Sequence, residues 1–361
     1  MPARCWFLQA RMRPGWSPKW WPDATPVPPF FSCACGKLQT LRCSPVSARR
    51  VVIALGGNAA YPPTIRGTAE EQLAVMAELC EHFVRMIEDG YQLILTHGNG
   101  PVVGNILFRM AKTALELPPM PMDVCVAHSQ GGMGYMLQQS FSNVLKRRGC
   151  DATVAAILTE VEVDPNDPAF VNPTKPVGKF FSAEEAARMA LETGWIFKED
   201  SGRGWRRVVA SPAPLKILDL AAIEALLAAG IIPIAAGGGG IPVVRDADAC
   251  HQGVAAVIDK DLTSAMLAAQ AGADTLIMLT GVPQVMLDFG KPGARAVARM
   301  TACEARKHMA DGQFPPGSMG PKVEAALNYL AARDGTVVIT SLEHAYDALG
   351  GSAGTRLVRD A

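Results

Sequence analysis

Three short apolar runs in this chain of 361 residues each end in a glycine-rich loop. The runs and their loops are residues 51–55 before Gly56-Gly57-Asn58, residues 91–96 before His97-Gly98-Asn99-Gly100-Pro101, and residues 231–235 before Gly237-Gly238-Gly239-Gly240. Such runs predict buried strands, and the first two loops open amphipathic helices. The sequence therefore predicts an α/β fold with a mainly parallel sheet and a site at the carboxyl ends of its strands.

Further elements follow the same alternation. Residues 123–148 predict one long helix, and residues 153–158, 275–280 and 337–340 predict strands, of which 337–340 is expected to be the last. The uncharged stretch 225–244 contains two prolines and the four-glycine run, which favours a helix end, a strand and a loop over a membrane span. Residues 161–214 are rich in Pro, Asn and aromatic residues and predict an inserted lobe that folds over a site.

The first 48 residues differ from the rest of the chain. Residues 1–50 hold eight of the 34 basic residues but only one of the 34 acidic residues. Residues 1–48 show no helical or strand periodicity, and we expect a disordered leader without chemistry. Either translation starts further downstream, or the leader is an organelle transit peptide. Residues 49–361 are then the folded domain.

Charge and cysteine content exclude several classes of protein. Equal numbers of basic and acidic residues give no reason to expect a nucleic-acid partner. The five cysteines after residue 50 have no CxxC spacing, which argues against a disulfide framework or a zinc site and for a reducing compartment, the cytoplasm. We expect these cysteines to be buried thiols.

The glycine loops are candidate anion sites. Backbone N–H groups in such loops, together with the N-terminus of a following helix, bind phosphate or carboxylate without a cationic side chain. One loop alone is also compatible with a tight turn that binds nothing. Three loops at three strand ends favour a ligand, although the sequence contains no GxxxxGK[ST] motif and no dinucleotide-binding GxGxxG motif.

Three lysines are placed to act on such an anion. Lys260 lies between Asp259 and Asp261, which would keep it charged; the alternative is a helix start with Asp259 as the cap and Lys260 in solvent. Lys322 begins a helix, where a cation opposes the helix dipole and must be compensated elsewhere. Lys175 stands between prolines on the inserted lobe.

No nucleophile or metal cage accompanies these lysines. The sequence contains no HExxH motif and no paired Cys/His cluster, and His97 suits either a ligand contact or a structural hydrogen bond. Glycine loops with converging lysines point to phosphoryl transfer by positioning and charge neutralisation.

Nine short words of this sequence resemble those of the carbamate kinase family, within the amino-acid kinase superfamily. They are VIALGGNA (52–59), THGNGP (96–101), VDPNDPAF (163–170), NPTKP (172–176), FKED (197–200), GRGWR (202–206), GGGGIP (237–242), VIDKD (257–261) and PGSM (316–319). The resemblance implies a three-layer αβα fold, a homodimer, and reversible transfer from ATP to carbamate with Mg²⁺ held by the nucleotide phosphates, not by protein side chains. ATP synthesis in carbamoyl phosphate and arginine catabolism is the role it suggests.

The resemblance also implies roles for particular residues. Gly56, Gly57, Asn58, Gly98, Asn99 and Gly100 would hold carbamate and the transferring phosphoryl group. Lys175 and Lys260 would neutralise that group, and Asp261 would orient the lysines. Lys322 and the loop of Gly237, Gly238, Gly239 and Gly240 would bind the nucleotide phosphates. The lobe 161–214 would be a lid that carries Lys175.

Some positions separate this chain from its relatives. Related kinases for amino-acid carboxylates usually have a lysine in the first strand, where this chain has Ile53-Ala54-Leu55, and this favours carbamate as the acceptor. Pro283, Lys179, Ala210 and Ala213 depart from the usual residues of the carbamate kinase family; the usual residue in place of Lys179 is proline. Two alternatives remain open: a kinase of this fold for another small acid, and a non-catalytic nucleotide-binding regulator.

Overall fold

The computed structural model describes residues 49–62, 64–200, 202–315 and 317–360. The expectations for residues 1–48 lie outside this part of the chain. Within it, no helix combines the length and the apolar character that crossing a membrane requires.

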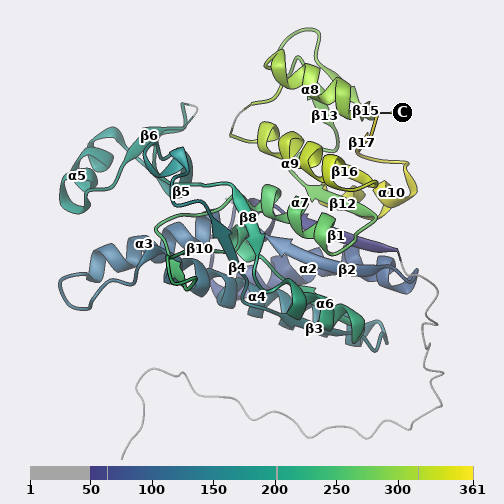
Figure 1. Ribbon diagram of the computed structural model, residues 1–361, viewed down its shortest axis with the longest axis horizontal. Coiled ribbons are helices and arrows are strands. Elements are labelled where there is room, and N and C mark those ends of the chain that lie inside the picture. Colours follow the sequence, from purple (N-terminus) through teal and green to yellow (C-terminus); the bar gives the residue numbers. More distant parts are fainter. Residues whose placement is uncertain (1–48, 63, 201, 316, 361) are drawn as a thin grey trace, which may run out of the picture. The chain divides into compact units, whose positions relative to one another are not determined.

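An eight-stranded sheet forms the centre of the domain (Figure 1). In spatial order its strands are β15 (Arg299–Thr301), β17 (Thr355–Val358), β16 (Thr336–Thr340), β12 (Thr275–Leu279), β1 (Arg50–Leu55), β2 (Gln92–His97), β9 (Ile231–Ile234) and β3 (Thr153–Ala156). Among the described residues, every neighbouring pair in this sheet is parallel except β16 and β17. The predicted α/β class is confirmed.

The central strand β1 separates two hydrophobic layers. Successive side chains of a strand point to opposite faces, so Val51 and Ile53 join one core cluster while Val52 and Ala54 join the other. Both faces of β1 are covered by helices, which explains why its residues 51–55 are all apolar and fully buried. This arrangement is the predicted three-layer sandwich.

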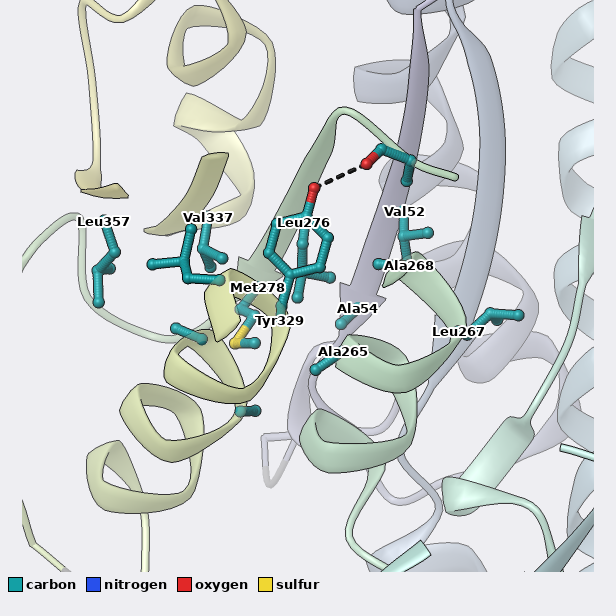
Figure 2. Close-up of a cluster of buried hydrophobic side chains, with 14 of the residues drawn as sticks. Val52, Ala54, Ala265, Leu267, Ala268, Leu276, Met278, Tyr329, Val337 and Leu357 are labelled. Atoms are coloured by element: carbon teal, nitrogen blue, oxygen red, sulfur yellow. Dashed lines mark hydrogen bonds between the residues drawn. The ribbon is translucent and has the colours of Figure 1, made fainter. Parts of the chain in front are cut away.

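Helices cover the two faces in separate groups. On one face lie α2 (Ala69–Glu88), α4 (Met122–Arg147) and α10 (Ala345–Gly350); on the other lie α6 (Leu220–Ala228), α7 (Lys260–Gln270) and α9 (Met319–Ala332). Figure 2 shows Ala265 and Ala268 of α7 and Tyr329 of α9 beside Ala54 of β1. The Tyr329 hydroxyl donates to the Ala273 carbonyl at 2.7 Å, which satisfies the polar end of a buried ring.

The lobe 161–214 has a sheet of its own. The strands β5 (Lys175–Phe181), β7 (Trp205–Val209) and β6 (Phe197–Glu199) are antiparallel, and α5 (Ala183–Thr193) follows β5. The ends of the lobe belong to a second small sheet, whose order is β11 (His251–Gly253), β10 (Ile241–Arg245), β4 (Glu160–Val163) and β8 (Pro214–Ile217). In Figure 1, β5 lies beside α3 (Gly100–Thr113).

The remaining elements are one helix of nine residues, α8 (Ala302–Ala310), and several shorter ones. The shorter elements are α1 (Gly57–Ala60), η1 (Pro168–Phe170), η2 (Gly237–Gly239), η3 (Leu342–His344) and the hairpin of β13 (Val285–Leu287) and β14 (Arg295–Val297).

Several sequence expectations need correction. The strand at residues 336–340 is not the last, because β17 follows and pairs antiparallel with it, burying Thr355 and Leu357. The strand expected over 153–158 ends at Ala156. The cysteines are not all buried: Cys150 is half-buried, Cys250 is exposed because it lies in the turn between β10 and β11, and Cys303 is exposed because it lies on the outer side of α8, whose Ala302 and Ala305 pack into the core. The stretch 225–244 does contain a helix end, a strand and a glycine loop, as predicted.

Candidate active site

The three glycine loops meet at the carboxyl ends of β1, β2 and β9. A Cβ atom placed on Gly98 would lie 2.8 Å from the backbone nitrogen of Gly57 and 3.1 Å from Cδ of Lys260. A Cβ atom on Gly238 would overlap the side-chain amide of Asn99. Backbones approach this closely only where Cβ atoms are missing, so the glycines are required for the loops to converge.

The third loop has a backbone that disfavours other residues. Gly238, Gly239 and Gly240 have φ angles of 68°, 93° and 94°, in the left-handed region. Neighbouring side chains hold the loop from two sides: Thr263 of α7 donates to the Gly239 carbonyl at 2.8 Å, and Gln130 of α4 donates to the Gly237 carbonyl at 2.9 Å. The loop is therefore fixed in position before any ligand arrives.

The start of helix α7 carries the central charges. Asp259 is the N-cap, and its Oδ1 accepts from the backbone N–H of Asp261 at 2.9 Å. Lys260 is only 8 % exposed and donates from Nζ to Asp261 Oδ1 at 2.6 Å. The alternative with Lys260 in solvent is therefore wrong, although its capping part is right. A buried lysine at a helix N-terminus needs such a partner, because both burial and the helix dipole disfavour its charge.

Lys322 completes a triad around the same carboxylate. It lies in the first turn of α9 and donates from Nζ to Asp261 Oδ2 at 2.8 Å. One carboxylate thus accepts from two lysines, one on each oxygen. The sequence predicted that the charge of Lys322, which opposes the helix dipole, needs a compensating partner, and this partner is Asp261, 61 residues earlier in the chain.

Burial and the paired charges shift the pKa values of the triad. Burial lowers the pKa of Lys260, and the attraction of Asp261 offsets only part of that shift. For Lys322, burial also acts to lower the pKa, but the Asp261 carboxylate outweighs it and the pKa is raised. Burial would raise the pKa of Asp261, yet the two ammonium groups hold it well below its usual range. Asp261 is therefore ionised at neutral pH.

Lys175 reaches this cluster from the lobe. Its Nζ lies 2.8 Å from Oδ2 of Asp259, and both side chains are about four-fifths buried. The resemblance implied that Asp261 orients the lysines; Lys175, however, pairs with Asp259, which the sequence marked only as a helix cap and a flanking charge. Burial acts to raise the pKa of Asp259, but Lys175 makes the net shift downward. The position of Asp259 next to Lys260 was the sequence feature that could have indicated its part in the site.

His97 stands behind the loops as a neutral group. It is 2 % exposed, its Nδ1 lies 3.3 Å from the Gly98 carbonyl, and burial is the main cause that lowers its pKa to about 4. The nearby Lys260 lowers it further. A neutral, hydrogen-bonded imidazole favours the structural interpretation of His97 over a charged ligand contact.

Asn58, which the sequence placed in the first glycine loop, has its backbone in the short helix α1. Its side chain lies outside the part of the chain that the structure describes.

The site contains three lysines and two aspartates beside the three glycine loops, whose backbones supply N–H groups. Among the described residues, no group of three or more His, Cys, Asp or Glu side chains is arranged to hold a metal ion. Such an arrangement is suited to an anion with several oxygens, such as a phosphoryl group, which N–H groups and ammonium groups surround and whose charge they neutralise.

Comparison with known proteins places this fold and site in one class. The amino acid kinase family matches residues 49–341, and the chain belongs to this family. Within it, the chain is similar to a carbamate kinase of Pyrococcus furiosus, with 45 % identity over 312 residues, 86 % of this chain and 99 % of the relative.

Solved structures give the same result. A carbamate kinase from Giardia lamblia bound to citric acid is 40 % identical, with a TM-score of 0.83, over 87 % of this chain and 99 % of that one. The same enzyme bound to AMP-PNP is 41 % identical, with a TM-score of 0.80 and the same coverage. The predicted family and fold are thereby confirmed.

Proposed function

We propose that this protein is a carbamate kinase, which reversibly transfers the γ-phosphoryl group of ATP to carbamate and so forms ADP and carbamoyl phosphate. The observation that carries the proposal is the meeting of Lys175, Lys260 and Lys322, from three separate elements, on the two aspartates that flank Lys260, beside the glycine loops. Relatives that are 45 % and 41 % identical and carry this name support it.

The chemistry needs no general base. Carbamate is already an anion, so one of its oxygens attacks the γ-phosphorus in line as the bond to the ADP oxygen breaks. The transition state spreads negative charge over the phosphoryl oxygens, and fixed positive groups stabilise it most. In this proposal Lys175 and Lys260 supply that charge, and Asp261 and Asp259 hold the two ammonium groups in place.

The glycine loops take the remaining anionic groups. Gly56, Gly57 and Asn58, with Gly98, Asn99 and Gly100, would donate backbone N–H groups to carbamate and the moving phosphoryl group. Gly237, Gly238, Gly239 and Gly240 would approach the phosphates of the nucleotide, with Lys322 as their counter-charge. The tight convergence of the loops supports one shared site.

The buried first strand supports carbamate as the acceptor. Ile53, Ala54 and Leu55 are fully buried and apolar, so β1 offers no cation next to its glycine loop. The charge that a strand lysine provides in related kinases must enter from elsewhere. Lys175, brought in by the lobe, supplies it in this proposal, which gives the lobe 161–214 the role of a lid.

Mg²⁺ fits the site as the partner of the nucleotide. Asp259 and Asp261 already accept from lysines, and the described residues offer no cage of acidic or imidazole groups. Mg²⁺ commonly keeps several waters and binds through substrate phosphates. When bound, it would neutralise part of the phosphate charge, and no protein side chain is assigned to it.

The proposal is tested by the reverse reaction. Full-length protein with ADP, Mg²⁺ and carbamoyl phosphate should form ATP, while acetyl phosphate, the control, should give little. ATP formation from both phosphates alike would favour a kinase for another small acid. ADP binding without turnover of either phosphate would favour a regulatory protein.

Three further expectations belong to this proposal. The enzyme would act in the cytoplasm and make ATP in carbamoyl phosphate and arginine catabolism. It would form a homodimer, and the edge strand β3 supports this, since Tyr135 and Leu158 beside it are 58 % and 56 % exposed. Light scattering of the wild-type protein and of Tyr135→Asp tests the dimer; the variant should be monomeric if this edge is the interface.

A further inference from the structure

The lobe touches helix α3 at a pair of glycines. Gly104 of α3 and Gly178 of β5 lie so close that a Cβ atom on Gly104 would overlap the Gly178 backbone. In the other direction, a Cβ atom on Gly178 would lie 3.2 Å from Cα of Gly104. Two backbones therefore pack directly against each other, an approach that only glycine permits at position 104.

The strand is bent at this point. Gly178 has a φ of 75°, and the pairing of β5 with β7 is irregular between Val177 and Phe181. Arg206 of β7 holds the irregular segment: its Nη2 donates to the Gly178 carbonyl at 3.0 Å, while its Nη1 donates to Asp200 at 3.2 Å. These two hydrogen bonds hold the bulge in one conformation, with Gly178 against Gly104 of α3.

Lys179 adds a second contact at the same place. Its Nζ lies 5.1 Å from the ring centre of Phe108 on α3 and 4.6 Å from that of Phe181 on β5. Both distances are in the range of cation–π attraction. Phe108 is one turn beyond Gly104, so the two residues share a face of α3.

We propose that Gly104, Gly178 and Lys179 form a seat that fixes the lobe on α3 and thereby positions Lys175. Helix α3 begins at Gly100, inside the second glycine loop, and Gly104 follows about 6 Å along its axis. Strand β5 begins at Lys175, three residues before Gly178. The seat thus sets the distance between the loop and Lys175. It deepens the proposed function and rests on it.

The first test uses Gly104→Ala in the full-length protein. Alanine has the higher helix propensity, so what opposes it is the contact with the β5 backbone at Val177 and Gly178. We expect kcat to fall about a hundredfold, as for a displacement of about 1 Å at a reacting group. The affinity for ADP should be unchanged, because the residues proposed to bind its phosphates lie outside α3 and the lobe. Gly350→Ala, at a helical glycine with no neighbour within 4 Å, is the control and should behave as wild type.

A double variant shows whether Gly104 acts through Lys175. In a Lys175→Ala background, Gly104→Ala should change kcat by less than about twofold, because the group that it positions is gone. The same hundredfold loss in both backgrounds would overturn the proposal, since Gly104 would then act elsewhere. Lys179→Met keeps the apolar stem and removes the cation, and should lower kcat about two- to fivefold without loss of folding.

Hydrogen exchange gives a readout that does not depend on turnover. In Gly104→Ala, the amides of residues 175–181 should exchange faster than in wild type, while those of the central sheet should not. If wild type lacks carbamate kinase activity but this difference appears, the proposed function fails and the seat stands. Unchanged exchange of 175–181 in both Gly104→Ala and Lys179→Met would refute the seat, whatever the activity.

Discussion

Asp259 combines two functions that substitutions can separate. Its Oδ1 caps helix α7 and its Oδ2 accepts from Lys175, at 2.9 and 2.8 Å. Serine at this position retains a capping oxygen but has no charge, whereas alanine has neither. Comparison of Asp259→Ser with Asp259→Ala therefore isolates the cap, and comparison of wild type with Asp259→Ser isolates the ion pair.

The structure sets the expected magnitudes. Exposed ion pairs contribute about 0–1 kcal/mol, whereas breaking a fully buried pair costs about 3–5 kcal/mol. The Lys175–Asp259 pair, 20 % and 23 % exposed, lies between these limits, and we expect Asp259→Ser to lower the free energy of unfolding by about 2 kcal/mol. Losing the cap as well should bring Asp259→Ala to about 3 kcal/mol.

The assay is a double-mutant cycle with Lys175→Met. Urea unfolding gives the stabilities, and ATP formation from carbamoyl phosphate gives kcat, which should fall at least about tenfold in Asp259→Ser as Lys175 loses its anchor. The two substitutions should couple by about 2 kcal/mol in stability. A coupling below about 0.5 kcal/mol would refute the ion pair, and equal stabilities of the serine and alanine variants would refute the cap.

Three other predictions follow from the site. Lys260→Ala should lower kcat about 10²- to 10³-fold with unchanged circular dichroism; a near-normal rate would remove Lys260 from the chemistry. Gly98→Ala should cost about 1–3 kcal/mol in urea unfolding and reduce kcat, because its Cβ would meet the Gly57 backbone at 2.8 Å, whereas Gly293→Ala, with open space around it, should do neither. Asp261→Asn should destabilise by about 3 kcal/mol at pH 7. Because the folded protein lowers the pKa of Asp261 below 3.8, this difference should shrink as the pH falls below about 4; a difference independent of pH would contradict the assignment.

The strands around the site could be predicted because burial leaves a local signature. Strand β1 is apolar from Val51 to Leu55 and is followed at once by Gly56, and β2 contains the apolar run Leu93-Ile94-Leu95 shortly before Gly98, so their bounds can be read within a residue or two. Strand β17 was missed because it has only four residues, two of them half-buried, and pairs at the outer side of the sheet. A short amphipathic segment without a following glycine loop has no such signature.

The pairing of charges could be predicted only in part. Lys260 and Asp261 are adjacent in the sequence, so their contact is local. The partner of Lys175 lies 84 residues away and depends on how the lobe returns to the sheet, which no pattern of residues records. The sequence indicated that Lys322 needed compensation but not which acid would provide it.

Lys175 belongs to the lobe, whereas the other charged residues of the site belong to α7, with its N-cap Asp259, and to α9, so the net charge of the site depends on the lobe. Without the lobe, Lys260 and Lys322 balance Asp259 and Asp261, and the cluster is neutral. With Lys175 in place, three ammonium groups face two carboxylates, and the cluster carries one net positive charge. An anionic transition state is stabilised by that excess, because a neutral cluster of paired charges offers it far less. In the proposed mechanism, the kinase whose first strand lacks a cation thus obtains this excess charge from Lys175 on the lobe, and the seat on α3 holds that charge in place.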